Sequence, residues 1–189
     1  MKSKTWSLVA AVTVLAIGVG GCSANNPGGQ AQGGVILSIT DFDGLPIQAS
    51  VNTLAAGGFL QIGQLDMQNI AADPTGNTST LMNVEVERYE VGFTRADEGT
   101  RLPRPTVRGI FGMVPVNGTI TYDNLPIMSA EEFTNQPLSD LLYENGGVDS
   151  ETGSEAILLN FEVKFYGRTL GGDRVETRVP ARFTIQFVP

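Results

Sequence analysis

The chain has 189 residues with 12 basic and 20 acidic side chains, a formal net charge of −8, no His and one Cys. This length is sufficient for one domain with its own hydrophobic core. The missing His excludes Ser-His-Asp and Cys-His catalysis and His-ligated metals, and a single Cys excludes intramolecular disulfides and thiolate clusters. The net acidity argues against a nucleic-acid partner, which would require a basic surface.

Residues 1–21 have the pattern of a secretory signal peptide. Lys2 and Lys4 form a short basic start, and the chain is then almost wholly apolar as far as Val19. This stretch is shorter than the roughly 20 apolar residues of a transmembrane helix, so we expect a cleaved signal. An uncleaved signal anchor, or an ordinary signal followed by a chance cysteine, is the alternative.

The only cysteine follows directly, in the motif Val-Gly-Gly-Cys at residues 19–22. This motif resembles the bacterial lipobox. The resemblance implies cleavage before Cys22, a thioether-linked diacylglycerol on its sulfur, and an acyl chain such as palmitate on its amino group. Several acyl chains anchor a protein stably to a membrane. Because Ser23 stands where an Asp favours inner-membrane retention, the resemblance implies the outer membrane if the source is Gram-negative.

Residues 22–33 are expected to form the lipidated cysteine and a flexible tether, since Gly, Asn, Gln and Pro dominate them. From residue 34 to residue 189 the chain shows short apolar runs separated by turn residues, which is typical of strands. Strands are predicted at 35–40, 46–54, 59–70 and 82–94, with a turn at 41–44. Val84 and Val86 lie on one face of the 82–94 strand and Tyr89 and Val91 on the other, which predicts a bulge near 87–88.

The second half begins with a Pro-rich loop at 101–105 and one or two shorter strands over 110–122. Residues 129–132 read Ser-Ala-Glu-Glu, a capping box, and Pro137 suits the start of a further helical turn. We therefore predict one or two short helical turns over 129–143, lying across the sandwich. Residues 144–155 follow as a polar, acidic loop.

The last two strands allow a prediction of register. The apolar residues of 157–165 and 175–187 are all odd-numbered, so one face of a hairpin must carry both sets. The favoured register sets Phe161 against Phe183 and Glu162 against Arg182. It also sets Arg168 against Glu176 and leaves residues 171–173 as the loop. Shifting it by two residues in either direction opposes like charges, which destabilises a sheet. Pro180 cannot donate to a ladder and is expected at an edge or a bulge.

About seven short strands with turn signals predict an all-β fold, a β-sandwich spanning 34–189. The stretch Ile-Thr-Asp-Phe-Asp-Gly-Leu-Pro-Ile at 39–47 resembles the first strand and turn of secreted bacterial immunoglobulin-like domains. So does Phe-Tyr-Gly-Arg at 165–168, followed by a Gly-Gly-Asp turn and a long final strand. The resemblance implies an immunoglobulin-like β-sandwich in a secreted setting, and it carries over no catalytic residue.

Two acidic segments raise the question of a metal site. The Asp-x-Asp-Gly motif at 41–44 departs from a calcium loop, because its Gly comes two positions early and Asn52 occupies the twelfth position. A plain turn is the better interpretation. The loop at 144–155 has four acidic residues, for which a solvated loop is favoured over weak calcium binding. No metal or cofactor is predicted.

Catalysis is not predicted either. Glu85, Glu87 and Glu90 lie close together on one strand, but their spacing is also that of an exposed strand face. Lys164 is the only lysine after residue 4, and its parity places it on the outer face of the hairpin, away from any Ser–Lys dyad.

The prediction from sequence is therefore a lipid-anchored binding or assembly module of the cell envelope, with an unidentified envelope protein as partner. Its binding loops are expected at 97–109, where Arg101, Arg104 and Arg108 cluster, and at 144–155. For the arginine-bearing loop, a solvent-exposed segment stiffened by Pro103 and Pro105 is the simpler interpretation. An accessory structural subunit of an envelope complex is the first alternative, and a carboxylate-dependent hydrolase is the second.

Overall fold

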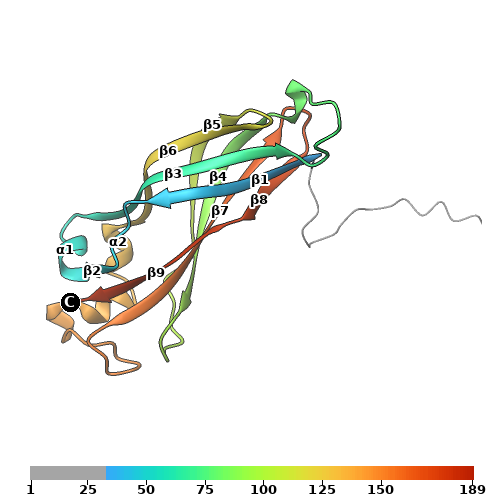
Figure 1. Ribbon diagram of the computed structural model, residues 1–189. Coiled ribbons are helices and arrows are strands. Elements are labelled where there is room, and N and C mark those ends of the chain that lie inside the picture. The colour runs from blue at the N-terminus through green and yellow to red at the C-terminus, as the bar shows by residue number, and fades with distance from the viewer. Residues whose placement is uncertain (1–32) are drawn as a thin grey trace, which may run out of the picture.

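A computed structural model describes residues 33–189, which form nine strands and several short helical turns (Figure 1). The predicted signal peptide, Cys22 and the tether up to residue 32 lie outside the described residues. The strands are β1 (Val35–Asp43), β2 (Gln48–Ser50), β3 (Phe59–Ala71), β4 (Val84–Arg95), β5 (Thr106–Val114), β6 (Gly118–Ser129), β7 (Ile157–Thr169), β8 (Arg174–Val179) and β9 (Ala181–Val188). The helical turns are α1 (Val51–Ala55), η1 (Thr80–Met82), α2 (Ala130–Phe133), η2 (Leu138–Leu141) and η3 (Tyr143–Asn145).

The strands form two layers. β6, β3 and β1 make one layer, and β5, β4, β7, β9 and β2 make the other. β8 joins them, because it pairs antiparallel with β7 and parallel with β1. The predicted all-β, sandwich-like fold is confirmed. No helix within residues 33–189 is long and apolar enough to cross a membrane.

The core lies between the layers and follows the predicted parity. Every odd-numbered residue of β7 is buried, as are most odd-numbered residues of β9. Phe161 stacks on Phe183 with ring centroids 5.0 Å apart and meets Phe93 edge-on at 5.1 Å. Such aromatic pairs add to the stabilisation gained from buried apolar area.

The predicted register of the terminal hairpin is confirmed for β9 and wrong for β8. Glu162 lies opposite Arg182 and Phe161 opposite Phe183, but near the turn Arg168 lies opposite Arg174 instead of Glu176. The two registers differ by two residues, which are accommodated around Pro180 where β8 ends and β9 begins. Since Pro180 has no N–H, it fits this interruption of the ladder, as predicted.

The β4 bulge is also confirmed. The pairing of β4 with both β5 and β7 shifts between Val86 and Arg88. The shift moves the buried set from even to odd positions, so that Val84, Val86, Tyr89 and Val91 all reach the core.

The segment after β1 differs from the prediction of a strand over 46–54 that returns beside β1. β1 continues to Asp43, and Gly44 has a positive φ of 75° that turns the chain. The chain then crosses to the other layer, where β2 pairs parallel with β9, and α1 begins after Ser50. The Ser50 hydroxyl accepts the Thr53 N–H, so this side chain caps α1.

The predicted helical turns over 129–143 are confirmed as α2 and η2. Glu132 closes the capping box by accepting the Ser129 N–H at 2.5 Å. Phe133, Leu138 and Leu141 are fully buried, so these turns cover one end of the core. β5 and β6 are both present and are longer than the predicted strands over 110–122.

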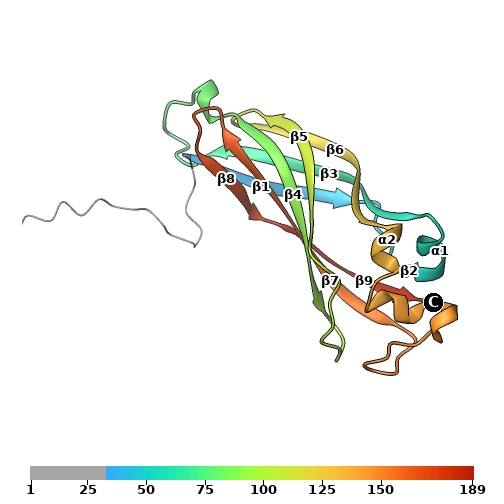
Figure 2. The ribbon, with the colours of Figure 1, turned by 180° about the vertical axis from the view of Figure 1, so that it is seen from behind.

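The two ends of the described chain lie at opposite ends of the sandwich (Figure 2). Gly33 packs beside Asp173 in the β7–β8 turn, whereas the Pro189 carbonyl accepts the Ser50 hydroxyl at 2.9 Å near α1. β7 spans the distance between these ends, and its 13 residues at about 3.3 Å each give roughly 40 Å. We call the end with Gly33 the tether end and the end with α1 and α2 the distal end.

Candidate functional site

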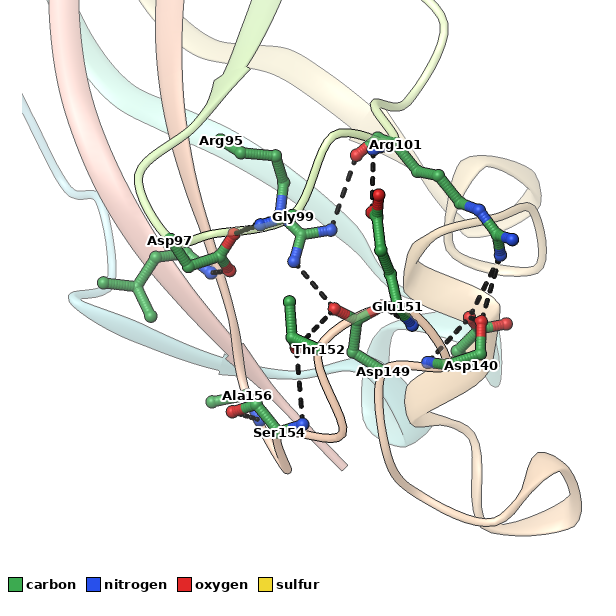
Figure 3. Close-up of polar contacts among 12 residues, drawn as sticks. Arg95, Asp97, Gly99, Arg101, Asp140, Asp149, Glu151, Thr152, Ser154 and Ala156 are labelled. Carbon is green, nitrogen blue, oxygen red and sulfur yellow. Dashed lines mark hydrogen bonds and ion pairs between the residues drawn. The ribbon is translucent and has the colours of Figure 1, made fainter.

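The two loops predicted to bind a partner lie side by side at the distal end (Figure 3). The loop after β4 and the loop before β7 are joined by hydrogen bonds and ion pairs, although about 50 residues separate them in the chain. We call this cluster the loop clamp: Arg95, Asp97, Thr100, Arg101, Asp140, Asp149, Ser150, Glu151 and Thr152.

Arg95 is the centre of the loop clamp. Its Nε donates to Asp97 Oδ1 at 2.5 Å and its Nη2 donates to Asp149 Oδ2 at 2.8 Å. The side chains of Arg95 and Asp149 are 3% and 0% exposed. One guanidinium therefore pairs with a carboxylate from each loop, and the buried charges of Arg95 and Asp149 neutralise each other as burial requires.

Further hydrogen bonds fix both carboxylates. Asp97 also accepts the N–H groups of Leu158 and Gly99, and Asp149 accepts the Thr152 hydroxyl at 2.7 Å. Desolvation by burial acts to raise the pKa of both carboxyls, but the hydrogen bonds and the charge of Arg95 outweigh it, so both pKa values lie below 3.8. Both groups are ionised at neutral pH, which suits a structural role.

A second set of contacts closes the outer side of the clamp. Glu151 accepts the backbone N–H groups of Thr100 at 2.8 Å and Arg101 at 3.0 Å, and it also binds the Thr100 hydroxyl. The Thr100 hydroxyl and these N–H groups lower the pKa of Glu151. Arg101 donates to Ser150 Oγ at 3.0 Å and lies 4.0 Å from Asp140.

These contacts correct two predictions. The 144–155 loop is not simply solvated, because Asp149 is buried and Glu151 is bonded, while Glu144 and Glu155 are exposed. The predicted arginine cluster is divided, since Arg108 belongs to β5 and pairs with Glu132 at 2.8 Å.

The clamp borders a hollow on the outer face of the β4–β7–β9 layer. This hollow has a volume of about 540 Å³. We call it the distal hollow; its outward-facing residues are Gly92, Thr94, Asn160, Glu162, Arg182 and Thr184. Thr94 directly precedes Arg95, so the clamp fixes one wall. The volume falls within the range of small-ligand sites.

The lining of the distal hollow also includes Phe93, Phe161 and Phe183 and is more apolar than polar, and its charged groups are balanced. Thr184 donates to Asn160 Oδ1 at 2.6 Å, and Arg182 pairs with Glu162 at 2.5 Å. The carbon that a side chain would add at Gly92 has only the Glu162 carbonyl nearby, at 3.8 Å, so glycine leaves the floor open. A largely apolar lining with hydroxyl and amide groups and an internally neutralised ion pair suits a ligand that has apolar surface, a few hydrogen-bonding groups and no strong net charge.

The other candidates are not assembled into a reactive site. Lys164 lies on the outer face and pairs with Glu162 at 2.6 Å, which raises the pKa of the lysine. Glu85, Glu87 and Glu90 face outward along β4, where Glu87 contacts Arg168 and Glu90 accepts the Tyr166 hydroxyl. Within residues 33–189 no three acidic side chains gather as metal ligands would.

Sequence reasoning missed Arg95 and the floor of the hollow. Arg95 ends a strand and has no local signal, because its partner Asp149 lies 54 residues away. Parity places Asn160, Glu162 and Thr184 on the outer face, which is the only sequence signal for the hollow.

Comparisons with known protein families, with curated proteins and with solved structures find no match for this chain.

Proposed function

We propose that this protein is a lipid-anchored binding module of the cell envelope, and that it acts without catalysis. Its anchor is the diacylglycerol expected on Cys22, and its binding surface is the loop clamp with the distal hollow. The partner is an envelope component with a polar group that hydrogen-bonds to Asn160 and Thr184.

One observation carries this proposal: the distal hollow and Gly33 lie at opposite ends of the same strands. A chain anchored at Cys22 enters the domain at the tether end. The distal hollow is then presented roughly 25 Å further from the membrane, since about eight residues of β7 at about 3.3 Å each separate its lining from that end. Anchoring also raises the effective concentration of the site near other envelope components, so a modest affinity suffices.

The groups around the hollow favour binding over reaction. The carboxylate of the hollow, Glu162, has a lowered pKa because Lys164 and Arg182 both donate hydrogen bonds to it. These hydrogen bonds outweigh desolvation by burial, which acts to raise the pKa. A carboxylate held in the ionised form by two cations is a poor proton donor, and general acid catalysis needs a raised pKa.

A second candidate is the accessory subunit of an envelope complex, favoured by the outer side of β5. Among the strands of residues 33–189, β5 is an edge strand that pairs only with β4, and Val107 and Phe111 on it are 60% and 73% exposed. Exposed apolar side chains on one face of an edge strand are typical of a protein interface.

Two glycine variants separate these candidates. Gly92→Gln fills the distal hollow, and Gly109→Gln places the same side chain on β5, where nothing lies within 4 Å of the new Cβ. Each is immobilised and tested for saturable capture of solubilised envelope components. The binding-module proposal expects capture to be lost in Gly92→Gln and retained in Gly109→Gln.

The reverse result favours the accessory subunit with its interface on β5. If both variants retain capture, the result contradicts both proposed binding sites. Hydrolase activity of the purified protein that disappears with one Glu or Asp substitution would overturn the non-catalytic proposal.

A further inference from the structure

Three arginines gather at the tether end, on the outer face of the β4–β7–β8 region. Arg88, Arg168 and Arg174 line a hollow of about 210 Å³ together with Glu87 and Tyr166. We call it the arginine hollow. It lies on the same layer as the distal hollow but shares no lining residue with it.

Cations outnumber carboxylates in the lining of the arginine hollow, while Glu85 lies opposite Arg168 and Glu176 opposite Tyr166 just outside it. Arg168 lies directly opposite Arg174 across the β7–β8 pair, a placement of like charges that destabilises a sheet. Glu87 is the single acidic residue in the lining, and it lies 3.2 Å from Arg168 Nε. The lining therefore has three positive charges and one negative charge, in a chain whose net charge is −8.

The guanidinium groups retain free donors. The guanidinium carbon of Arg88 lies over the Tyr166 ring, 4.7 Å from its centroid, which is within cation–π distance. Among residues 33–189, neither Arg88 nor Arg174 has a hydrogen-bond or ion-pair partner. Arginine edges of this kind bind phosphate oxygens in pairs.

Two backbone features shape this hollow. The β4 bulge at Glu87 leaves both Glu87 and Arg88 exposed on the outer side. At Gly167 a Cβ would lie 2.2 Å from the carbonyl oxygen of Glu85, so only glycine lets β7 approach the bulged strand. Bulges frequently redirect side chains at functional sites.

We infer that the arginine hollow binds a phosphate group, either of a free phosphate compound or of a phospholipid headgroup. An excess of two positive charges matches a phosphate better than a carboxylate, which has one negative charge and two oxygens. The lipid source rests on the proposed function: residue 33 adjoins the β7–β8 turn beside the hollow, so anchoring at Cys22 would bring it near the headgroups. Phosphate binding itself does not depend on that anchor.

Calorimetric titration of the full chain in uncharged detergent tests the inference, with two probes. Inorganic phosphate represents the free source, and dihexanoyl phosphatidylglycerol, below its micelle concentration, represents the headgroup. Saturable binding of either probe is expected, and Arg174→Gln should weaken it about tenfold or more. Arg178→Gln is the matched control, since it removes the same charge from an exposed position on β8 outside the hollow. Its affinity should stay within about twofold.

Phospholipid that binds and displaces inorganic phosphate identifies the headgroup as the source, and binding of inorganic phosphate alone identifies a free compound. Absence of saturable binding by both probes overturns the inference. Equal losses in Arg174→Gln and Arg178→Gln also overturn it, because they indicate general electrostatic attraction. These outcomes are independent of capture at the distal hollow and of the lipid on Cys22, so failure here is distinguishable from failure of the proposed function.

Discussion

Replacing Arg95 with Met removes the charge at the centre of the loop clamp while keeping a side chain of similar length. The change leaves Asp149, which is 0% exposed, without a cation, and its remaining side-chain donor is Thr152 at 2.7 Å. Removing one partner of a buried ion pair typically costs about 3–5 kcal/mol, because an uncompensated charge stays buried. Asp97 is 19% exposed and keeps two backbone donors, so most of the cost should arise at Asp149.

Urea denaturation of the two proteins, followed by circular dichroism, measures this difference in the free energy of unfolding. Arg101→Met is the control, because this arginine is 48% exposed and lies 4.0 Å from its carboxylate partner. An exposed pair contributes about 0–1 kcal/mol, so the control should differ little from the parent protein. The double variant Arg95→Met/Asp149→Asn should lose clearly less than the two single losses together, since the residues interact directly.

The pH dependence gives an independent readout of the same pair. The pKa values of Asp97 and Asp149 are lowered by folding, so their stabilisation is fully present above the unfolded value near 3.8 and is lost as the pH falls through the lowered values. The free-energy difference between the parent and Arg95→Met should therefore be largest above about pH 5 and shrink in acid. A difference below about 1 kcal/mol at neutral pH, or one that is unchanged in acid, would refute the buried-pair argument.

Three further predictions concern the core, the bulge and the anchor. Phe161→Ala should cost about 3–5 kcal/mol of unfolding free energy, and Phe183→Ala should cost less because Phe183 is only partly buried. Small and equal losses in the two variants would show that the core and outer faces of the β7–β9 pair are assigned the wrong way round. Gly167→Ala should destabilise by about 1–3 kcal/mol through contact with the Glu85 carbonyl, whereas Gly109→Ala should not; equal melting temperatures would contradict this steric argument. Mass spectrometry of membrane-extracted protein should show a chain beginning at Cys22 with added acyl mass that Cys22→Ser lacks; an unmodified full-length chain would contradict lipidation.

Period-2 patterning predicted the parts of the fold that depend on one buried face. The odd-numbered apolar residues of β7 and β9 required both sets to share one face, and the change of parity in β4 required a bulge. Opposite charges then selected the register that sets Phe161 against Phe183. The predicted register of β8 was wrong because charges across the β7–β8 hairpin alone do not decide it. In the structure Glu87 of β4 lies beside Arg168, and the Thr177 hydroxyl accepts the Phe165 N–H at 3.0 Å, so contacts outside the hairpin support the other register.

The functional surfaces were predictable only in part. Loops 97–109 and 144–155 were both identified, but the pairing of Arg95 with Asp149 depends on how β4 and β7 align, which no local pattern specifies. The crossing of the chain after Gly44 was missed because apolar spacing in 46–54 suits a strand, although Ser50 is a typical helix cap. Local signals therefore identified strands and loops, while tertiary pairing decided which loops meet.

The central claim is that the tethered protein binds its partner with the distal end. Photo-crosslinking in the native envelope tests it most directly, with a photoreactive residue at Thr184 in the distal hollow or at Leu170, which is 45% exposed at the tether end. We predict one defined adduct from position 184, weakened in a Cys22→Ser background, and no such adduct from position 170. A partner captured from position 170 alone, or equally from both positions, would contradict the claim.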